Sequence, residues 1–157
     1  MTKNLFSPLL AALLMVGVAA PVLAQSATAP TASMATAQDA SLYTALGEIA
    51  GLTKLTDDFV NRLKADSRLS TAFKDANPKN LKLMLMQQFC SVSGGPCKYE
   101  GGDMKSVHAD MDITKTDFNA LVEVLQQSMD ANGIAFTTQN QLLARLAPMH
   151  RDIITIK

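Results

Sequence analysis

The sequence is poor in the side chains that usually mark a binding or catalytic site. Its 157 residues include no tryptophan, two tyrosines, two cysteines and two histidines. Positive and negative side chains balance, so the formal net charge is zero. A neutral chain without a basic stripe is not expected to bind nucleic acid. So few aromatic side chains also leave a small core short of apolar bulk, a deficit that a bound cofactor would offset.

Long apolar runs are missing as well. The N-terminal run Leu9–Ala20 has 12 residues, whereas a transmembrane helix needs roughly 20. The run follows a basic start and precedes small residues ending at Ala24, so residues 1–24 are predicted to be a cleaved secretory signal peptide. Residues 25–41 are rich in Ala, Ser and Thr and are predicted to be a disordered leader. Residues 42–157 then form one domain of a periplasmic or secreted protein, without a membrane anchor after cleavage.

The two cysteines, Cys90 and Cys97, enclose six residues that end in Gly94-Gly95-Pro96. Closely spaced cysteines in an exported chain predict a disulfide. A metal thiolate site would need further cysteines at a different spacing, and c-type haem attachment would need a Cys-x-x-Cys-His motif. The sequence has neither.

Apolar residues recur at helical spacing along most of the domain, as Leu52, Leu55 and Phe59 do. Asn77 followed by Pro78 indicates one helix start, and Thr114 with Asp117 indicates another that resembles a capping box. No segment alternates as a strand does, so the fold class is predicted to be all-α. The predicted helical segments are 42–66 with a break at Gly47, then 78–92, 101–110, 114–133 and 137–156.

The two histidines have different surroundings. His108 shares a helix face with Met104, Val107 and Met111, and a buried imidazole needs a hydrogen-bond partner or a metal. From these residues alone, a satisfied core histidine remains the commoner explanation. His150 is followed by charged residues near the C-terminus and is predicted to lie at the surface.

Several segments together match one family, and the spacing from Phe73 through the Gly-Gly-Pro turn to His108 fits it without a gap. From about Leu42 to Ile154 the sequence resembles the group 1 truncated haemoglobins. The resemblance implies a two-over-two helical sandwich around a non-covalent haem b that binds a diatomic gas such as oxygen, nitric oxide or carbon monoxide. The segments that carry it are Ser41–Tyr43, 57–66, Phe73, 94–101, 103–114, Phe118 and Pro148.

The resemblance also implies roles for single residues. His108 is expected to be the proximal ligand of the haem iron, with the Met104 carbonyl orienting its ring. Phe73 is expected to pack against the haem face, and Lys82 and Tyr99 to reach the propionates. The proximal side and the haem edge are expected to be lined by Met104, Val107, Ile113, Phe118 and Leu121.

On the distal side the sequence departs from the family. Val60 stands where many members have tyrosine, and Leu85 where they commonly have glutamine. With Leu81 one turn earlier, the expected distal pocket is apolar and offers a bound gas no hydrogen-bond donor. Met84 stands where some members have a histidine as sixth iron ligand, so a Met84 thioether ligand is one hypothesis and an ordinary apolar methionine is the other.

These expectations leave four functions open. The leading one is oxygen binding or transport at iron held by His108. Electron transfer through a haem ligated by His108 and Met84, with a redox partner, is the second. Nitric oxide dioxygenase or peroxidase-like catalysis is disfavoured, because the distal side lacks a positioned donor or acid. A helical bundle without haem is the fourth.

Overall fold

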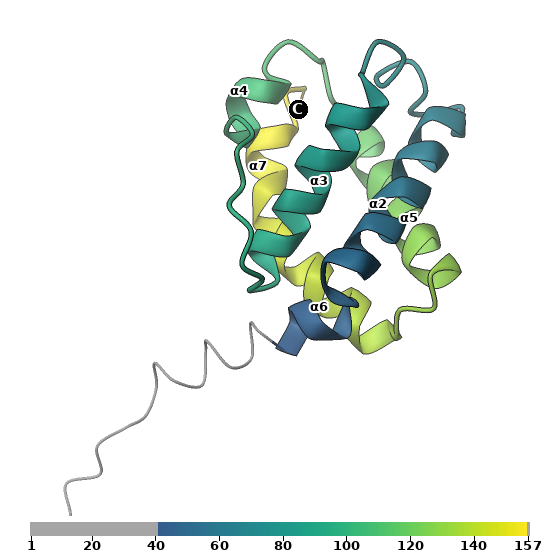
Figure 1. The fold of residues 1–157 in the computed structure, drawn as a ribbon. Helices are drawn as coiled ribbons and strands as arrows, with labels where there is room; N and C mark the ends of the chain where they lie inside the picture. Colours follow the sequence, from purple (N-terminus) through teal and green to yellow (C-terminus); the bar gives the residue numbers. More distant parts are fainter. Residues whose placement is uncertain (1–40, 157) are drawn as a thin grey trace, which may run out of the picture.

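The computed structural model describes residues 41–156, so the predicted signal peptide and nearly all of the predicted leader lie outside the described residues. Ser41, expected in the leader, instead begins a short helix at residues 41–45. The other helices are α2 (Glu48–Ala65), α3 (Pro78–Val92), α4 (Met104–His108), α5 (Lys115–Ala131), α6 (Phe136–Leu146), the 3-10 turn η1 (Ala147–Met149) and α7 (His150–Ile153) (Figure 1). Residues 41–156 contain no strand, which confirms the all-α prediction for this part of the chain. Within the same range, no helix is long and apolar enough to cross a membrane.

The two predicted helix starts have the expected polar caps. The Asn77 side chain accepts hydrogen bonds from the backbone N–H groups of Lys79 and Asn80 at the start of α3. Thr114 and Asp117 form a complete capping box at the start of α5, each side chain accepting from the other's backbone. The Thr114 hydroxyl, with its backbone N–H, lowers the pKa of Asp117. These caps satisfy N–H groups that the helix itself leaves unpaired.

The prediction of one continuous helix over 137–156 is wrong. Helix α6 ends at Leu146, and Pro148 lies in the 3-10 turn that separates it from α7. Proline has no N–H to donate and its ring clashes with the preceding helical turn, so it interrupts the helix there. After α7 the chain is extended, and the N–H groups of Thr155 and Ile156 both lie 3.0 Å from the Ile113 carbonyl. This pairing ties the C-terminal tail to the segment between α4 and α5.

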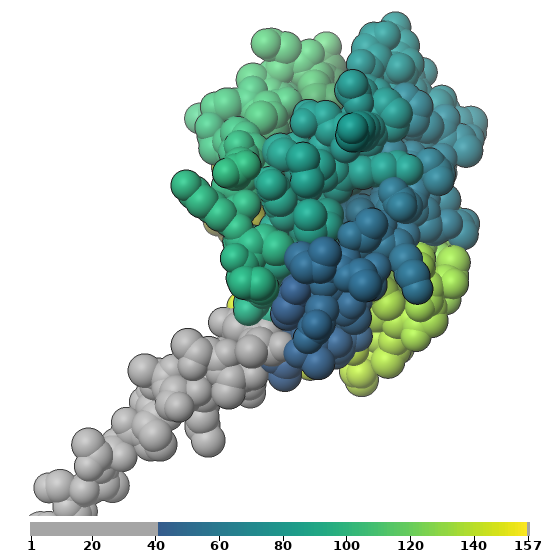
Figure 2. All heavy atoms as spheres, viewed as in Figure 1, coloured from purple at the N-terminus to yellow at the C-terminus, as the bar shows by residue number. Residues whose placement is uncertain are grey.

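Helix α2 is the centre of the core and packs against α3 and α5. The predicted apolar stripe of α2 is buried, and the Phe59 ring lies 6.3 Å from the Phe89 ring of α3. Figure 2 shows that side chains of α2 and α3 fill the space between the two ribbons of Figure 1. In Figure 1, α3 stands between the α2–α5 pair and α4 with α7, which contact each other. Thus α3 lies between the α2–α5 pair of the core and the smaller pair formed by α4 and α7.

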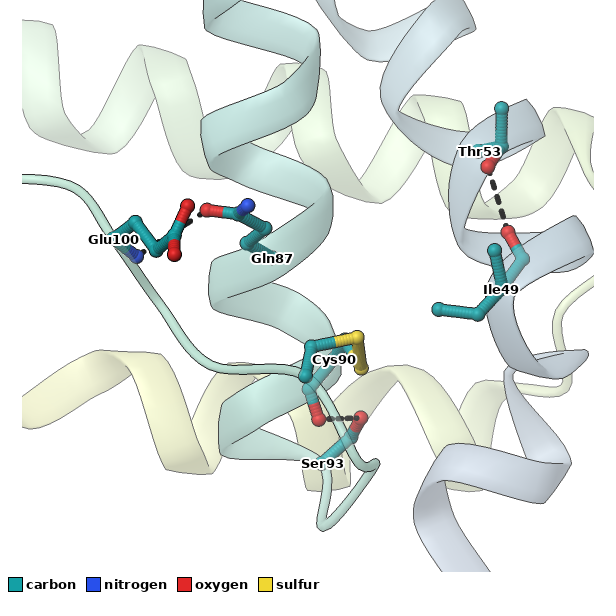
Figure 3. The surroundings of a disulfide bond; sticks show 7 residues. Ile49, Thr53, Gln87, Cys90, Ser93 and Glu100 are labelled. Atoms are coloured by element: carbon teal, nitrogen blue, oxygen red, sulfur yellow. Dashed lines mark hydrogen bonds between the residues drawn. A yellow bond between two sulfur atoms is a disulfide. The ribbon is translucent and has the colours of Figure 1, made fainter.

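The predicted disulfide is present and joins Cys90, near the end of α3, to Cys97 in the following loop. The Cys90 side chain is buried at this end of the helix (Figure 3). A Cβ at position 95 would lie 2.6 Å from the Cys90 sulfur and 2.6 Å from the Tyr43 ring, so only glycine fits there. The Tyr43 N–H donates to the Ser93 carbonyl at 3.1 Å. The disulfide therefore holds together the end of α3, the loop and the short helix at 41–45.

Candidate functional site

A cavity of about 980 Å³ lies among α2, α3, α4, α5 and the C-terminal segment. This volume is at the upper end of the range for small-molecule and cofactor sites. Its wall is largely apolar and includes most of the residues that the sequence indicated. Those residues are Phe73, Leu81, Met84, Leu85, Tyr99, Met104, Val107, His108, Phe118 and Leu121.

His108 lies at the C-terminal end of α4, and its half-buried ring lines the cavity. The ring Nδ1 is 2.7 Å from the Met104 carbonyl oxygen, as the resemblance implied. A carbonyl only accepts, so Nδ1 carries the proton and the neutral ring has its lone pair on Nε2. Nε2 has no hydrogen-bond partner among the described residues. The ring is therefore oriented by one nitrogen and is free to ligate a metal with the other.

The N-terminus of α4 is fixed by polar contacts. Asp103 accepts from the Ser106 N–H at 3.0 Å and from the Ser106 hydroxyl at 2.6 Å. The hydroxyl bond, followed by the N–H bond, lowers the pKa of Asp103. Nearby, the Tyr99 hydroxyl donates to the Gly102 carbonyl at 3.1 Å. Burial, and then the charge of Asp103, raise the pKa of Tyr99, so this hydroxyl stays neutral and keeps the proton that it donates to Gly102.

Three residues, one expected in the distal pocket and two expected to contact the haem, are not part of the cavity wall. Val60 is fully buried in α2 but does not reach the cavity. The Lys82 ammonium lies 3.1 Å from the Asp57 carboxylate, an ion pair between α3 and α2. The Ile113 backbone pairs with the C-terminal tail. His150 is exposed as predicted, with Nδ1 2.9 Å from the Ala147 carbonyl.

The structure also adds residues that were not among the expected site residues, including Gln88, which the sequence placed near the distal leucines but as a poor substitute for a distal donor. Gln88 is the main one, because it brings an amide into a largely apolar wall. It follows Leu81 and Leu85 by seven and three positions, so helical spacing from the distal leucines was the signal that could have identified it. The neighbouring Gln87 is directed away, to the Glu100 N–H at 3.3 Å (Figure 3). Other additions to the cavity wall are Phe59, Met111, Leu125, Leu143 and Met149.

Comparison with known sequences agrees with this arrangement. The family model of the bacterial-like globins matches residues 41–155. The chain belongs to this globin family. A group 1 truncated hemoglobin, GlbN of Mycolicibacterium paratuberculosis, is 32% identical over 119 residues, which cover 76% of this chain and 88% of the relative. The group 1 truncated hemoglobin LI410 of Chlamydomonas moewusii is 28% identical over 122 residues, covering 74% of this chain and 70% of the relative. The resemblance to group 1 truncated haemoglobins is thus confirmed.

Solved structures agree on the fold of this globin. Truncated hemoglobin from Tetrahymena pyriformis in its Fe(III) form has a TM-score of 0.69 at 21% identity, covering 72% of this chain and 97% of the other. The 2/2 hemoglobin from Synechococcus sp. PCC 7002, in the cyanomet state with covalently attached heme, also has a TM-score of 0.69, at 19% identity, covering 73% and 98%. The two-over-two globin fold is confirmed.

The residues of this globin fit a haem. The cavity is apolar and large, and an imidazole with a free Nε2 lines it. Membership of the globin family supports haem-based binding of a diatomic gas in general. When bound, the haem supplies the iron at which a gas coordinates. The chain supplies an apolar enclosure, the oriented imidazole and the side chains that surround the gas.

Proposed function

We propose that this globin holds a non-covalent haem b through His108 and reversibly binds a diatomic gas, oxygen first, outside the cytoplasm. The observation that carries the proposal is the 2.7 Å contact between His108 Nδ1 and the Met104 carbonyl inside the 980 Å³ apolar cavity. That contact leaves Nε2 as the ligating nitrogen and fixes the plane of the ring. Extracytoplasmic location rests on the predicted signal peptide and on the disulfide, which oxidising compartments favour.

The side chains on α3 support reversible binding over oxygen catalysis. The three expected distal residues Leu81, Met84 and Leu85 line the cavity, and none of them can donate a strong hydrogen bond or deliver a proton. The amides of Asn80 and Gln88 on the same helix also line the cavity, and the Gln88 amide is directed to the sulfurs of Met104 and Met149. Oxygen chemistry at a haem depends on such groups. An apolar distal side therefore favours binding and release of the gas, and we expect release to be fast.

The test of the haem site is replacement of His108. In protein purified with haem, His108→Ala should lower haem affinity by at least about a hundredfold. Removing only the hydrogen-bond partner of a metal ligand already lowers metal affinity roughly ten- to a hundredfold, and here the ligand itself is removed. Absorption spectra and haem transfer to an acceptor protein measure the effect. His150→Ala, which changes the other histidine, is the matched control and should behave as wild type. An unchanged spectrum in His108→Ala would show that another residue holds the iron.

The distal side is tested with Leu85→Gln, because Leu85 lines the cavity whereas Val60 does not. The substitution places an amide donor in the apolar wall, and a hydrogen bond to a charged group contributes about 1.5–3 kcal/mol. Oxygen release should therefore slow by about ten- to a hundredfold, while carbon monoxide, which is less polar when bound, should be little affected. Leu83→Gln, on the exposed side of α3, is the control. Slow oxygen release already in the wild type would contradict an apolar distal site.

Electron transfer is a second candidate, favoured by one observation: Met84 lines the same cavity as His108. A His/Met pair raises the potential of a haem. If Met84 occupies the sixth position, carbon monoxide binding should contain a slow step that Met84→Leu removes. Rapid carbon monoxide binding in both proteins would leave gas binding as the function.

The non-covalent attachment of the haem is tested by extraction with acidified organic solvent. Haem that stays with the polypeptide would contradict non-covalent binding.

A further inference from the structure

Two adjacent glutamines of α3 have opposite surroundings. Gln87 points away from the cavity, toward the loop, where its Oε1 accepts from Glu100 (Figure 3). Gln88 lines the cavity, and its Nε2 lies 3.4 Å from the Met104 sulfur and 3.5 Å from the Met149 sulfur. A partly buried amide normally pairs with oxygen, because thioether sulfur is a weak acceptor. Here the amide meets two thioethers from separate segments of the chain.

These contacts join three segments that line the cavity. Gln88 belongs to α3, Met104 is the first residue of α4, and Met149 is the last residue of η1. The Met104 carbonyl is also the acceptor for His108 Nδ1 at 2.7 Å. A short path of contacts thus runs from the α3 side chain, through Met104, to the imidazole.

Helix α4 has few other attachments. It has five residues, none of them buried, and a helix of that length is unstable without tertiary contacts. Its described contacts are the Asp103 cap, the packing against α7 and the contact of Met104 with Gln88. Of these, the Gln88 contact links α4 directly to α3.

We infer that Gln88 is a positioning residue: its amide holds α4 and the C-terminal segment against α3 and so fixes where His108 presents Nε2. The part of the inference that concerns iron rests on the proposed function. The part that concerns α4 does not, because the contacts are made between protein side chains alone. Gln88 therefore acts on the imidazole through Met104 and touches neither ligand nor iron in this role.

The matched variants are Gln88→Leu and Gln87→Leu, the same chemical change on neighbouring residues of one helix. The first readout is hydrogen exchange of α4 in the protein as purified, with or without haem. Losing two weak hydrogen bonds that together approach one of ordinary net strength predicts exchange about two- to tenfold faster in Gln88→Leu, as at the Val107 amide that bonds to Asp103. Gln87→Leu should leave α4 exchange unchanged. Equal exchange in both variants and the wild type would overturn the inference.

Met104→Leu provides the second test, since it conserves volume and removes the sulfur acceptor. If the two groups act together, Met104→Leu and Gln88→Leu should each speed α4 exchange, and the double variant should exchange no faster than either alone. Additive effects would overturn the inference. If Gln88→Leu folds poorly, Met104→Leu alone still tests whether loss of the sulfur contact speeds α4 exchange, and unchanged exchange in it would overturn the inference.

The third readout is the iron–histidine stretching band of the ferrous protein in resonance Raman spectra. It should shift in Gln88→Leu and stay at the wild-type position in Gln87→Leu. A changed α4 exchange in protein that binds no haem would support the role of Gln88 and contradict the proposed function. A normal haem spectrum with unchanged α4 exchange would support the proposed function and contradict the role of Gln88.

Discussion

Helices α3 and α4 lie on different walls of the cavity and differ in what holds them in place. Helix α3 has 15 residues, buries Phe89 and Cys90 and packs along α2. Helix α4 has five residues and buries none of them. Its N-terminal end is held instead by the Asp103 cap and by the contact of Met104 with Gln88. The cavity wall formed by α3 is thus part of the core, whereas the wall that carries His108 depends on polar contacts and on packing against α7.

The largest difference should appear when an apolar side chain is removed from each helix. Phe89 is 2% exposed and stacks near Phe59, so Phe89→Ala should lower the free energy of unfolding by about 3–5 kcal/mol. Val107 of α4 is 46% exposed, so Val107→Ala should change it by about 0.5 kcal/mol or less. Urea unfolding of both variants measures the comparison. Similar losses would mean that α4 belongs to the core.

The features of the helices that depend on local patterns could be predicted from the sequence. The stripe of α2, the start of α3 at Pro78 and the capping box of α5 all follow from residues a few positions apart. The contact between His108 and the Met104 carbonyl could also be predicted, because residues four apart in a helix meet on one face. Family resemblance then indicated which histidine matters.

Contacts between distant segments could not be predicted from the sequence. Nothing in the sequence near Gln88 shows that its amide meets Met149, which is 61 positions away. Likewise, Lys82 was expected near the haem propionates, but Asp57 of α2 lies within ion-pair distance of it. The break of the last helix at Pro148 is different: a local signal was present, but apolar periodicity continued past it and outweighed it in the prediction.

The disulfide gives a smaller effect that bears on both helices. It ties the buried end of α3 to the loop that leads to α4, so reduction should release the loop more than the core. A loop this short is expected to contribute about 2–3 kcal/mol to the free energy of unfolding on the chain-entropy model. Denaturant unfolding with and without reductant measures it, and thiol counting under denaturing conditions should find no free thiol before reduction. A reduced protein of unchanged stability would contradict the expected contribution.

The smallest effect, and the one specific to α4, is its response to acid. Hydrogen bonds from Ser106 lower the pKa of Asp103 in the folded protein below its ordinary value of about 3.9. Since the unfolded chain then binds the proton more readily, the contribution of Asp103 is fully present above pH 4 or so and is lost as the pH falls through the lowered folded pKa.

Acid should therefore loosen α4 through its cap. Asp103→Asn keeps an N-cap acceptor without a titrating charge, whereas Asp103→Ala removes both. We expect Asp103→Ala to speed exchange of the Val107 amide at every pH. In Asp103→Asn, exchange of the α4 amides should stay near the wild-type rate at neutral pH. Below pH 4, acid should speed α4 exchange less in Asp103→Asn than in the wild type. The capping box of α5 titrates in the same direction, because Asp117 also has a lowered pKa. Measuring exchange in α4 and α5 separately distinguishes the effect of acid on the Asp103 cap from its effect on the Asp117 cap. An identical acid response of α4 in wild type and Asp103→Asn would show that packing against α7, and not the cap, limits its opening.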